Sequence, residues 1–251
     1  GMVVEIASPR PVILGTAAAE TLRGTEGGDI ISGRGGADRL MGGLGDDTYV
    51  IDQPGALVVE RLSDGGIDTV VASVTHTLAS RVENLTLGGS AAIGGTGNTL
   101  DNLIIGNAGS NRLAGAGGND TLRGDRGNDD LVGGTGADRL VGGAGQDGYL
   151  VDDAGDVVIE AIGEGTDRVR TTLSSYTLPE HVEQLVALGA VGLAGTGNGM
   201  ANLITGGSGA DTLAGGGGRD TLVGGGGADA FLYAGIGDAL DLIIAYDAAE
   251  D

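Results

Sequence analysis

Acidic and amide side chains recur every nine residues in this 251-residue chain, and oxygen ligands at such a spacing could bind a metal. In residues Gly115–Arg123, for example, glycine opens the unit, aspartate stands at the sixth place and leucine at the eighth. Carboxylates and backbone carbonyls are the ligands that calcium prefers, about six to eight for each ion. The sixth-place residues that we expect to bind calcium are Asp29, Asp38, Asp47, Asn102, Asn111, Asp120, Asp129, Asp138, Asp147, Asn202, Asp211, Asp220 and Asp229.

The same period predicts the elements that position these side chains. The eighth place is apolar in all fourteen units, from Leu22 to Phe231. A three-residue strand points its middle side chain inward and its neighbours outward, whereas glycine in the first half of each unit allows a tight turn. If two units complete one coil, unit n stacks on unit n+2. The sixth-place carboxylates then lie about 4.8 Å apart, the spacing of neighbouring strands.

Phased runs of four, six and four units resemble the RTX family, whose hemolysin-type calcium-binding repeats have the nonapeptide pattern GGxGxDxUx. The similarity is close in Gly42–Val50, Gly133–Val141 and Gly206–Ala214. We therefore expect an all-β fold, a right-handed parallel β-roll or β-helix solenoid with two wider β inserts. The resemblance also implies a bacterial extracellular protein, exported by type I secretion, that folds where calcium is abundant.

Stacking of alternate units predicts which residues share an ion. Carboxylates one coil apart repel each other unless a cation lies between them, and we expect about five to eight calcium ions. The better sites should be Asp29/Asp47, Asn111/Asp129, Asp120/Asp138, Asp129/Asp147 and Asp211/Asp229. Glutamate or amide should weaken Glu20/Asp38, Asn102/Asp120 and Asn202/Asp220, and asparagine also suits a plain turn.

A longer repeat is superimposed on the short one, because residues 42–132 recur as 142–232. The predicted segments are an N-terminal cap (1–14), repeats (15–50), a β insert (51–96), repeats (97–150), a β insert (151–196), repeats (197–232) and a C-terminal cap (233–251). Valine, threonine and leucine predict insert strands near 56–60, 68–74 and 82–87, and near 157–160, 167–173 and 182–188. In the caps, Val3–Ile6 and Asp241–Ile244 should each add a covering strand or short helix.

Aromatic rings mark the ends of the three runs. Tyr49, Tyr149 and Phe231 stand at the eighth place where the other units have leucine or isoleucine. We expect these rings to be buried and to fill a cross-section that widens there.

Composition excludes several other classes. The formal net charge is −22, and all thirteen cationic residues are arginine, which argues against nucleic acid or an anionic membrane surface as partner. No apolar run approaches the roughly 20 residues of a membrane span. The 54 glycines follow a period of nine rather than the three of collagen, and a flexible linker would not keep its apolar residues in phase.

The remaining polar residues form no recognisable catalytic group, so we expect no enzymatic activity from this chain. His76 and His181 do not occupy matching places in the longer repeat, and we interpret them as ordinary surface histidines. Acidic residues that recur in both inserts should be solvated or cap turns, with metal binding as the alternative. These are Glu60/Glu160, Asp68/Asp167 and Glu83/Glu183.

The favoured function is a calcium-binding module that folds with its ions and serves as a structural or adhesion element, with a cell-surface or polysaccharide partner. Two alternatives stay open. One is an accessory region of a larger secreted enzyme, such as the proteases, lipases and alginate epimerases that carry RTX repeats. The other is a glycan-binding face on the solenoid.

Overall fold

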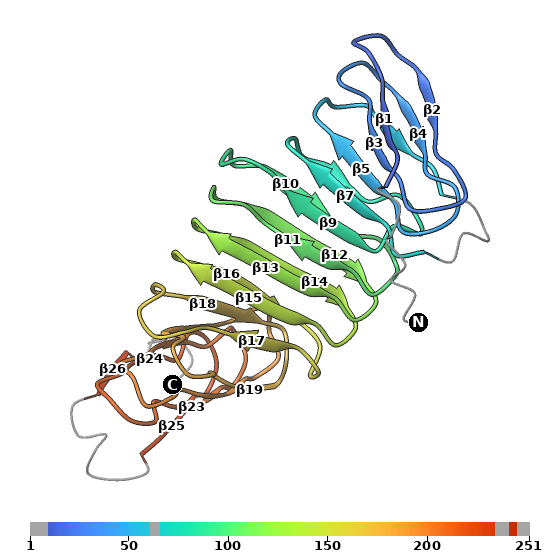
Figure 1. Cartoon of the computed structure of the whole chain (residues 1–251). Helices are drawn as coiled ribbons and strands as arrows, with labels where there is room; N and C mark the ends of the chain where they lie inside the picture. The colour runs from blue at the N-terminus through green and yellow to red at the C-terminus, as the bar shows by residue number, and fades with distance from the viewer. Residues whose placement is uncertain (1–9, 61–65, 234–240, 245–251) are drawn as a thin grey trace, which may run out of the picture.

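The computed structural model describes residues 10–60, 66–233 and 241–244, which form a parallel β-solenoid (Figure 1). Each strand pairs in parallel with the strand two places later, except at one break in each face, so the chain alternates between two faces. This arrangement confirms the predicted all-β fold and the stacking of unit n on unit n+2. Within the described residues, no helix could cross a membrane.

Odd-numbered strands form the first face. Nine of them make one continuous sheet: β1 (Val12–Leu14), β3 (Ile30–Ser32), β5 (Thr48–Ile51), β7 (Thr69–Ala72), β9 (Asn84–Leu87), β11 (Leu103–Ile105), β13 (Thr121–Arg126), β15 (Arg139–Ala144) and β17 (Val157–Ile159). A four-stranded sheet follows, made of β19 (Ser175–Thr177), β21 (Ala194–Thr196), β23 (Thr212–Ala214) and β25 (Ala230–Leu232). The break in this face therefore falls inside the second insert.

Even-numbered strands form the second face. A three-stranded sheet comprises β2 (Thr21–Arg23), β4 (Arg39–Met41) and β6 (Leu57–Val58). A ten-stranded sheet then comprises β8 (His76–Thr77), β10 (Gly94–Thr96), β12 (Arg112–Gly117), β14 (Asp130–Thr135), β16 (Gly148–Val151), β18 (Arg168–Thr171), β20 (Gln184–Ala187), β22 (Leu203–Thr205), β24 (Thr221–Val223) and β26 (Leu242–Ile244). Here the break falls inside the first insert, between β6 and β8.

The inserts continue the solenoid, as predicted, although their coils differ in length. In the repeats Leu122 pairs with Leu140, eighteen residues later. In the first insert Tyr49 pairs with Val70, and Val70 with Leu85. All of these residues are fully buried, so the inward column of side chains runs through the insert without interruption. The strands β8, β10, β19 and β21 were not predicted.

One apolar column makes the core. The eighth-place leucines from Leu113 to Leu140 are fully buried, as are the rings of Tyr49 and Tyr149. Burial of these two rings was expected, whereas Phe231 is only half-buried and packs against the end of the column. At the C-terminal end, β26 pairs with β24 and supplies the covering strand predicted for Asp241–Ile244. The corresponding prediction for Val3–Ile6 lies outside the described residues.

The longer repeat contains an odd number of strands, which has a geometric consequence. Residues 48–51 form β5 on the odd face, whereas their counterparts at 148–151 form β16 on the even face. A repeat of 100 residues therefore ends half a coil out of phase. Equivalent features of the two inserts consequently lie on opposite edges of the solenoid.

Candidate metal centre

The predicted ligands lie in two rows, each made of the residues that directly precede the strands of one face. The odd row contains Asp29, Asp47, Asp68, Glu83, Asn102, Asp120, Asp138 and Asp156, and ends with Asp211 and Asp229. The even row begins with Glu20 and Asp38, and contains Asn111, Asp129, Asp147, Asp167, Glu183, Asn202, Asp220 and Asp241. Every sequence-predicted ligand thus occupies one of these two edges.

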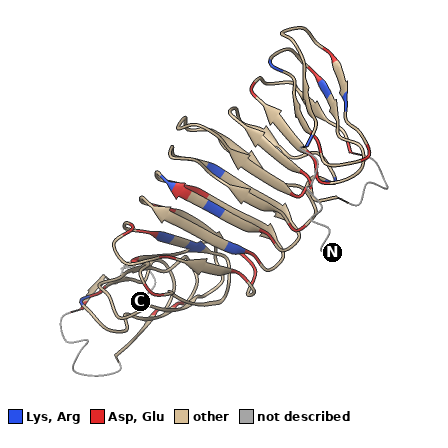
Figure 2. Ribbon diagram, in the orientation of Figure 1, with Lys and Arg blue, Asp and Glu red and all other residues tan. Residues whose placement is uncertain are grey.

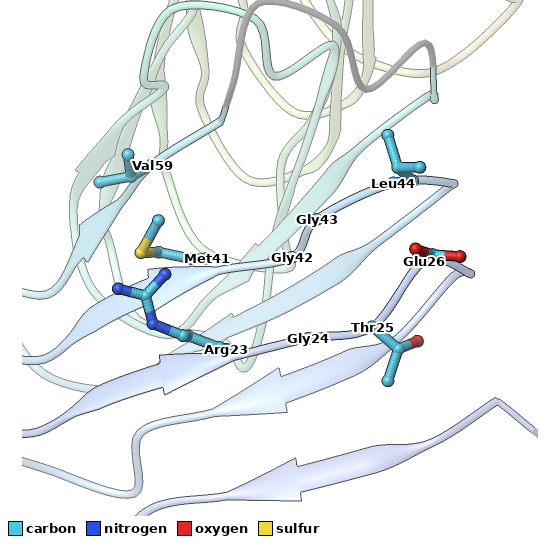
Figure 3. Close-up of a pocket in the computed structure, with 9 residues that line it drawn as sticks. All are labelled: Arg23, Gly24, Thr25, Glu26, Met41, Gly42, Gly43, Leu44 and Val59. Atoms are coloured by element: carbon cyan, nitrogen blue, oxygen red, sulfur yellow. The ribbon is translucent and has the colours of Figure 1, made fainter.

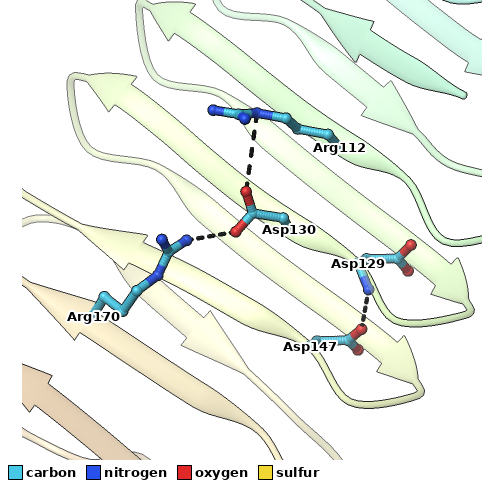
Figure 4. A network of polar contacts seen from close by, with 5 residues as sticks. All are labelled: Arg112, Asp129, Asp130, Asp147 and Arg170. Atoms are coloured by element: carbon cyan, nitrogen blue, oxygen red, sulfur yellow. Dashed lines mark hydrogen bonds and ion pairs between the residues drawn. The ribbon is translucent and has the colours of Figure 1, made fainter.

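Neighbouring members of a row are joined by a repeated hydrogen bond. The backbone N–H of Asp120 donates to Oδ1 of Asp138 at 2.7 Å, and that of Asp129 donates to Oδ1 of Asp147 at the same distance (Figure 4). The same bond joins Glu20 to Asp38, Asp29 to Asp47, Asn102 to Asp120, Asn111 to Asp129, Asn202 to Asp220 and Asp211 to Asp229. All eight predicted pairs are therefore stacked as expected.

The second carboxylate oxygen is the one available to a cation. In Asp120, Asp129, Asp138 and Asp147, Oδ2 is buried and has no hydrogen-bond partner in the described part of the chain. A Cβ atom added to Gly124 would lie 2.2 Å from Oδ2 of Asp129 and 2.6 Å from the carbonyl oxygen of Gly142. A carboxylate and a main-chain carbonyl of the next coil therefore converge beside this glycine. Such oxygen pairs fit the preference of calcium.

Burial makes these carboxylates costly to ionise without a cation. It raises the pKa of Asp120 and Asp129 to about 6, although the backbone N–H of the preceding coil partly opposes this shift. For Asp147, burial and the neighbouring carboxylates raise the pKa to about 7. A buried charge of this kind needs a cation or a proton as compensation. Calcium between the coils would supply the compensation at neutral pH.

The turns of the central run differ from the others. Strands β12, β13, β14 and β15 are six residues long because their turn residues also pair, as Ala116 does with Gly134 and Asp125 with Gly143. Ala116 and Asp125 have positive φ angles of 85° and 81°, which favour glycine. These four strands adjoin Asp120, Asp129, Asp138 and Asp147, in each of which Oδ2 lacks a partner among the described residues. The central run is therefore the best-formed part of the site.

The asparagines bind the insert coils through their amides. Nδ2 of Asn102 donates to the carbonyl oxygens of Val82 and Glu83 at 3.1 and 3.0 Å. Nδ2 of Asn202 donates to Val182 in the same way, and Nδ2 of Asn111 to Ile93. Each amide N–H₂ group thus links a repeat coil to the neighbouring insert coil. An aspartate at the same place would put a carboxylate against the carbonyl oxygens of the insert. The sequence left open a plain turn role for these asparagines, and the structure instead gives their amides hydrogen bonds between coils. Their part in calcium binding stays a prediction.

Carboxylates in the outer runs are more fully used by the protein itself. In Asp211, Oδ1 accepts a hydrogen bond from Leu193 N at 2.6 Å and Oδ2 accepts one from Gly207 N at 2.8 Å. In Asp29, Oδ2 accepts hydrogen bonds from the backbone and hydroxyl of Thr25, whereas Oδ1 is buried without a partner. An ion at Asp211 would compete with existing hydrogen bonds, whereas Asp29 keeps one oxygen available, as the central aspartates do.

Three of the recurring acidic residues of the inserts are buried rather than solvated, which the sequence interpretation did not favour. Asp68 and Asp167 are each 1% exposed and Glu160 is 8% exposed. Glu183 does cap a turn, since its Oε2 accepts the N–H of Asp167 at 2.8 Å. His76, expected at the surface, is half-buried in β8, and burial lowers its pKa.

Most of the described arginines lie on strands rather than in turns. Figure 2 shows acidic residues concentrated where strands meet turns, with arginines on the strands. Asp130 on β14 accepts a hydrogen bond from Nη2 of Arg170 at 2.5 Å and lies 3.9 Å from Nε of Arg112 (Figure 4). This exposed ladder binds neighbouring coils on the even face without using the rows.

A groove of about 370 Å³ lies at the N-terminal end (Figure 3). Arg23, Met41 and Val59 line one part, whereas Glu26 and Leu44 line the other. Among the nine lining residues Glu26 is the one carboxylate.

Stacked turns whose carboxylates and carbonyls converge define a calcium-binding β-roll. Residues 14–49, 96–131, 123–158 and 196–231 match the RTX calcium-binding nonapeptide repeat in four copies. These segments cover more than half of the chain, which therefore belongs to the RTX family of calcium-binding repeat proteins.

One curated relative is similar over part of its length. The chain is 40% identical over 95 residues to the endo-1,3-1,4-beta-glycanase ExsH of Rhizobium meliloti (strain 1021). The matched segment covers 38% of this chain and 20% of that protein. The similarity thus spans about a fifth of the glycanase.

Proposed function

We propose that this chain is a structural module of a secreted bacterial protein, and that it folds when calcium enters its two rows of carboxylates. The supporting observation is the set of buried Oδ2 atoms without partners in Asp120, Asp129, Asp138 and Asp147. Four such charges at coil spacing oppose folding, and calcium removes the opposition. Export through a low-calcium cytoplasm into a calcium-rich exterior would then control where the module folds.

Calcium titration of the chelated protein tests this proposal. Calorimetry should count about five to eight ions, and far-UV circular dichroism should show β structure forming over the same range of calcium. Magnesium should be a poor substitute, because it demands a stricter octahedral geometry. A chelated protein that already has its full β signal, and that binds no calcium, would contradict the proposal.

The second candidate is an accessory region of a larger secreted enzyme, and the glycanase match supports it. On this proposal the chain contributes stability or substrate proximity, and a separate domain performs the catalysis. The coding sequence on either side of these residues would reveal such a domain. The isolated chain should not hydrolyse a mixed-linkage β-glucan, with or without calcium. Hydrolysis by the purified chain would assign catalysis to these residues instead.

An adhesion role differs from both in requiring a ligand. A glycan array probed with the calcium-loaded chain, and again with chelator, tests it. Binding that needs calcium would support a glycan-binding face on the folded solenoid.

A further inference from the structure

We propose that Asp147, Glu160 and Asp167 form an additional calcium site where the central run passes into the second insert, with Tyr149 closing one side. This site uses a side chain where the ordinary repeats use the main chain. It goes beyond the proposed function, because its third ligand, Glu160, is not a member of either row.

The three carboxylates come from three successive passes of the chain. Asp147 precedes β16, Glu160 follows β17 and Asp167 precedes β18. One oxygen of each lies within 4.8 Å of one oxygen of the others, and all three side chains are buried. Ligands at 2.3–2.6 Å from a calcium ion are at most about 5.2 Å apart. The cluster therefore has the right size without rearrangement.

In each carboxylate, a hydrogen bond to one oxygen fixes the side chain and leaves the other oxygen unbonded. Oδ1 of Asp147 accepts the N–H of Asp129, and Oδ1 of Asp167 accepts the N–H of Asp147 at 2.8 Å. The Tyr149 hydroxyl donates to Oε1 of Glu160. The other oxygens, Oδ2 of both aspartates and Oε2 of Glu160, are buried without a hydrogen-bond partner among the described residues. Each of the three carboxylates thus keeps one buried oxygen that no group among the described residues satisfies.

The register between β15 and β17 explains the position of Glu160 in the cluster. Val141 pairs with Ile159, so Glu160 occupies the place one coil after Gly142. In a repeat this place belongs to a glycine that brings its carbonyl oxygen toward the neighbouring carboxylate. A Cβ added to Gly142 would lie 2.1 Å from the Tyr149 hydroxyl, 2.3 Å from Oδ2 of Asp147 and 2.6 Å from Oε1 of Glu160. The glycine at 142 therefore leaves the space that the carboxylates use.

Charge balance calls for a cation. Three carboxylates carry a formal charge of −3, and both ion pairs in the described part of the chain go to Asp130 instead. Calcium would compensate this buried charge and bind oxygens of all three carboxylates. Hard oxygen ligands, without nitrogen or sulfur, favour calcium over transition metals.

A similar grouping of carboxylates, with Glu60 only partly buried, occurs in the first insert. Oxygens of Asp47, Glu60 and Asp68 also lie within 4.8 Å of one another, and the Tyr49 hydroxyl donates to Oε1 of Glu60. Because the longer repeat ends half a coil out of phase, this second cluster lies on the opposite edge. Each entry into an insert would then be fixed by one ion.

Terbium(III), which mimics calcium, is a suitable probe because a nearby tyrosine sensitises its emission and the chain contains no tryptophan. Terbium should give tyrosine-sensitised emission in the full chain. Glu160→Gln should remove roughly half of it, the share of Tyr149, and calorimetry should count one calcium ion fewer. Glu60→Gln combined with Glu160→Gln should remove most of the emission. Glu180→Gln, an exposed change in the same insert, should alter neither measurement.

Two further measurements separate this site from the rows and from misfolding. Asp120→Asn should lower the total calcium count and leave the sensitised emission in place, so failure of the rows and failure of this site are distinguishable. Anomalous scattering from a terbium-loaded crystal of the unmodified chain should show a peak between Asp147, Glu160 and Asp167. Absence of that peak, or unchanged emission in folded Glu160→Gln, would overturn the proposal.

Discussion

Replacing Asp129 with asparagine should have opposite effects with and without calcium. Asp129 stands in the central run, where its Oδ1 accepts the N–H of Asn111 at 2.7 Å and its own N–H donates to Asp147. Asparagine preserves the acceptor at Oδ1 and replaces the buried, unpartnered Oδ2 by N–H₂. The substitution therefore removes a cation ligand while leaving the coil-to-coil hydrogen bonds intact.

The magnitude follows from the place of Asp129 between two coils, where it contributes to an ion on each side. At a calcium concentration ten times the dissociation constant, each ion contributes about 1.4 kcal/mol, so losing both costs about 3 kcal/mol. In chelator the same change removes a buried charge whose pKa is raised to about 6. The free energy of unfolding should then stay level or rise.

Urea unfolding followed by circular dichroism measures the effect in calcium, and the far-UV circular dichroism signal that remains in chelator measures the effect without calcium. Asp130→Asn is the matched control, because Asp130 lies on the exposed ladder with Arg170 and outside the rows. Its loss should cost at most about 1 kcal/mol in calcium, as exposed ion pairs do. Equal destabilisation by Asp129→Asn in both buffers would refute the assignment of Oδ2 to a cation.

Three further predictions concern protons, the core and the turns. In chelator, lowering the pH from about 7 to about 4 should increase the β structure seen by circular dichroism. Burial raises the folded-state pKa of Asp120 to about 6 and of Asp147 to about 7, so protons bind the folded chain more tightly than the unfolded chain. Loss of β structure over that pH range would contradict this prediction. Leu131→Ala should cost about 2–5 kcal/mol of unfolding free energy in calcium, since Leu131 is fully buried, and a smaller cost would mean a loose core. Gly124→Ala should lower the calcium affinity measured by calorimetry at least about tenfold, because the added Cβ would clash with Oδ2 of Asp129 and the carbonyl oxygen of Gly142. Gly199→Ala is the control and should not lower the affinity, because the space around its Cβ is open.

The nine-residue period was enough to predict the fold and the rows. Because a strand side chain alternates in direction and strands pair at fixed spacing, counting by eighteen residues gave the neighbours of Asp120 and Asp129 correctly. The apolar eighth place likewise predicted the buried column from Leu113 to Leu140.

Counting by eighteen residues did not predict the stacked neighbours where the coils change length. Asp167 lies twenty residues after Asp147 in the same row, and Glu160 occupies a place that is glycine in the repeats, so neither fits the nonapeptide pattern. A usable signal was present, since Tyr149, Glu160 and Asp167 all have counterparts in the first insert. The hydrogen bonds of the Asn102 amide could not be predicted either, because they depend on carbonyls in an insert coil of irregular length.

The most direct measurement is an anomalous difference map from a crystal of the chain grown in ample calcium. Peaks should appear beside Oδ2 of Asp120, Asp129 and Asp138, about 2.3–2.6 Å from that atom and from a main-chain carbonyl of a stacked coil. A well-ordered solenoid with no ion beside these three oxygens would contradict the claim that calcium joins its coils.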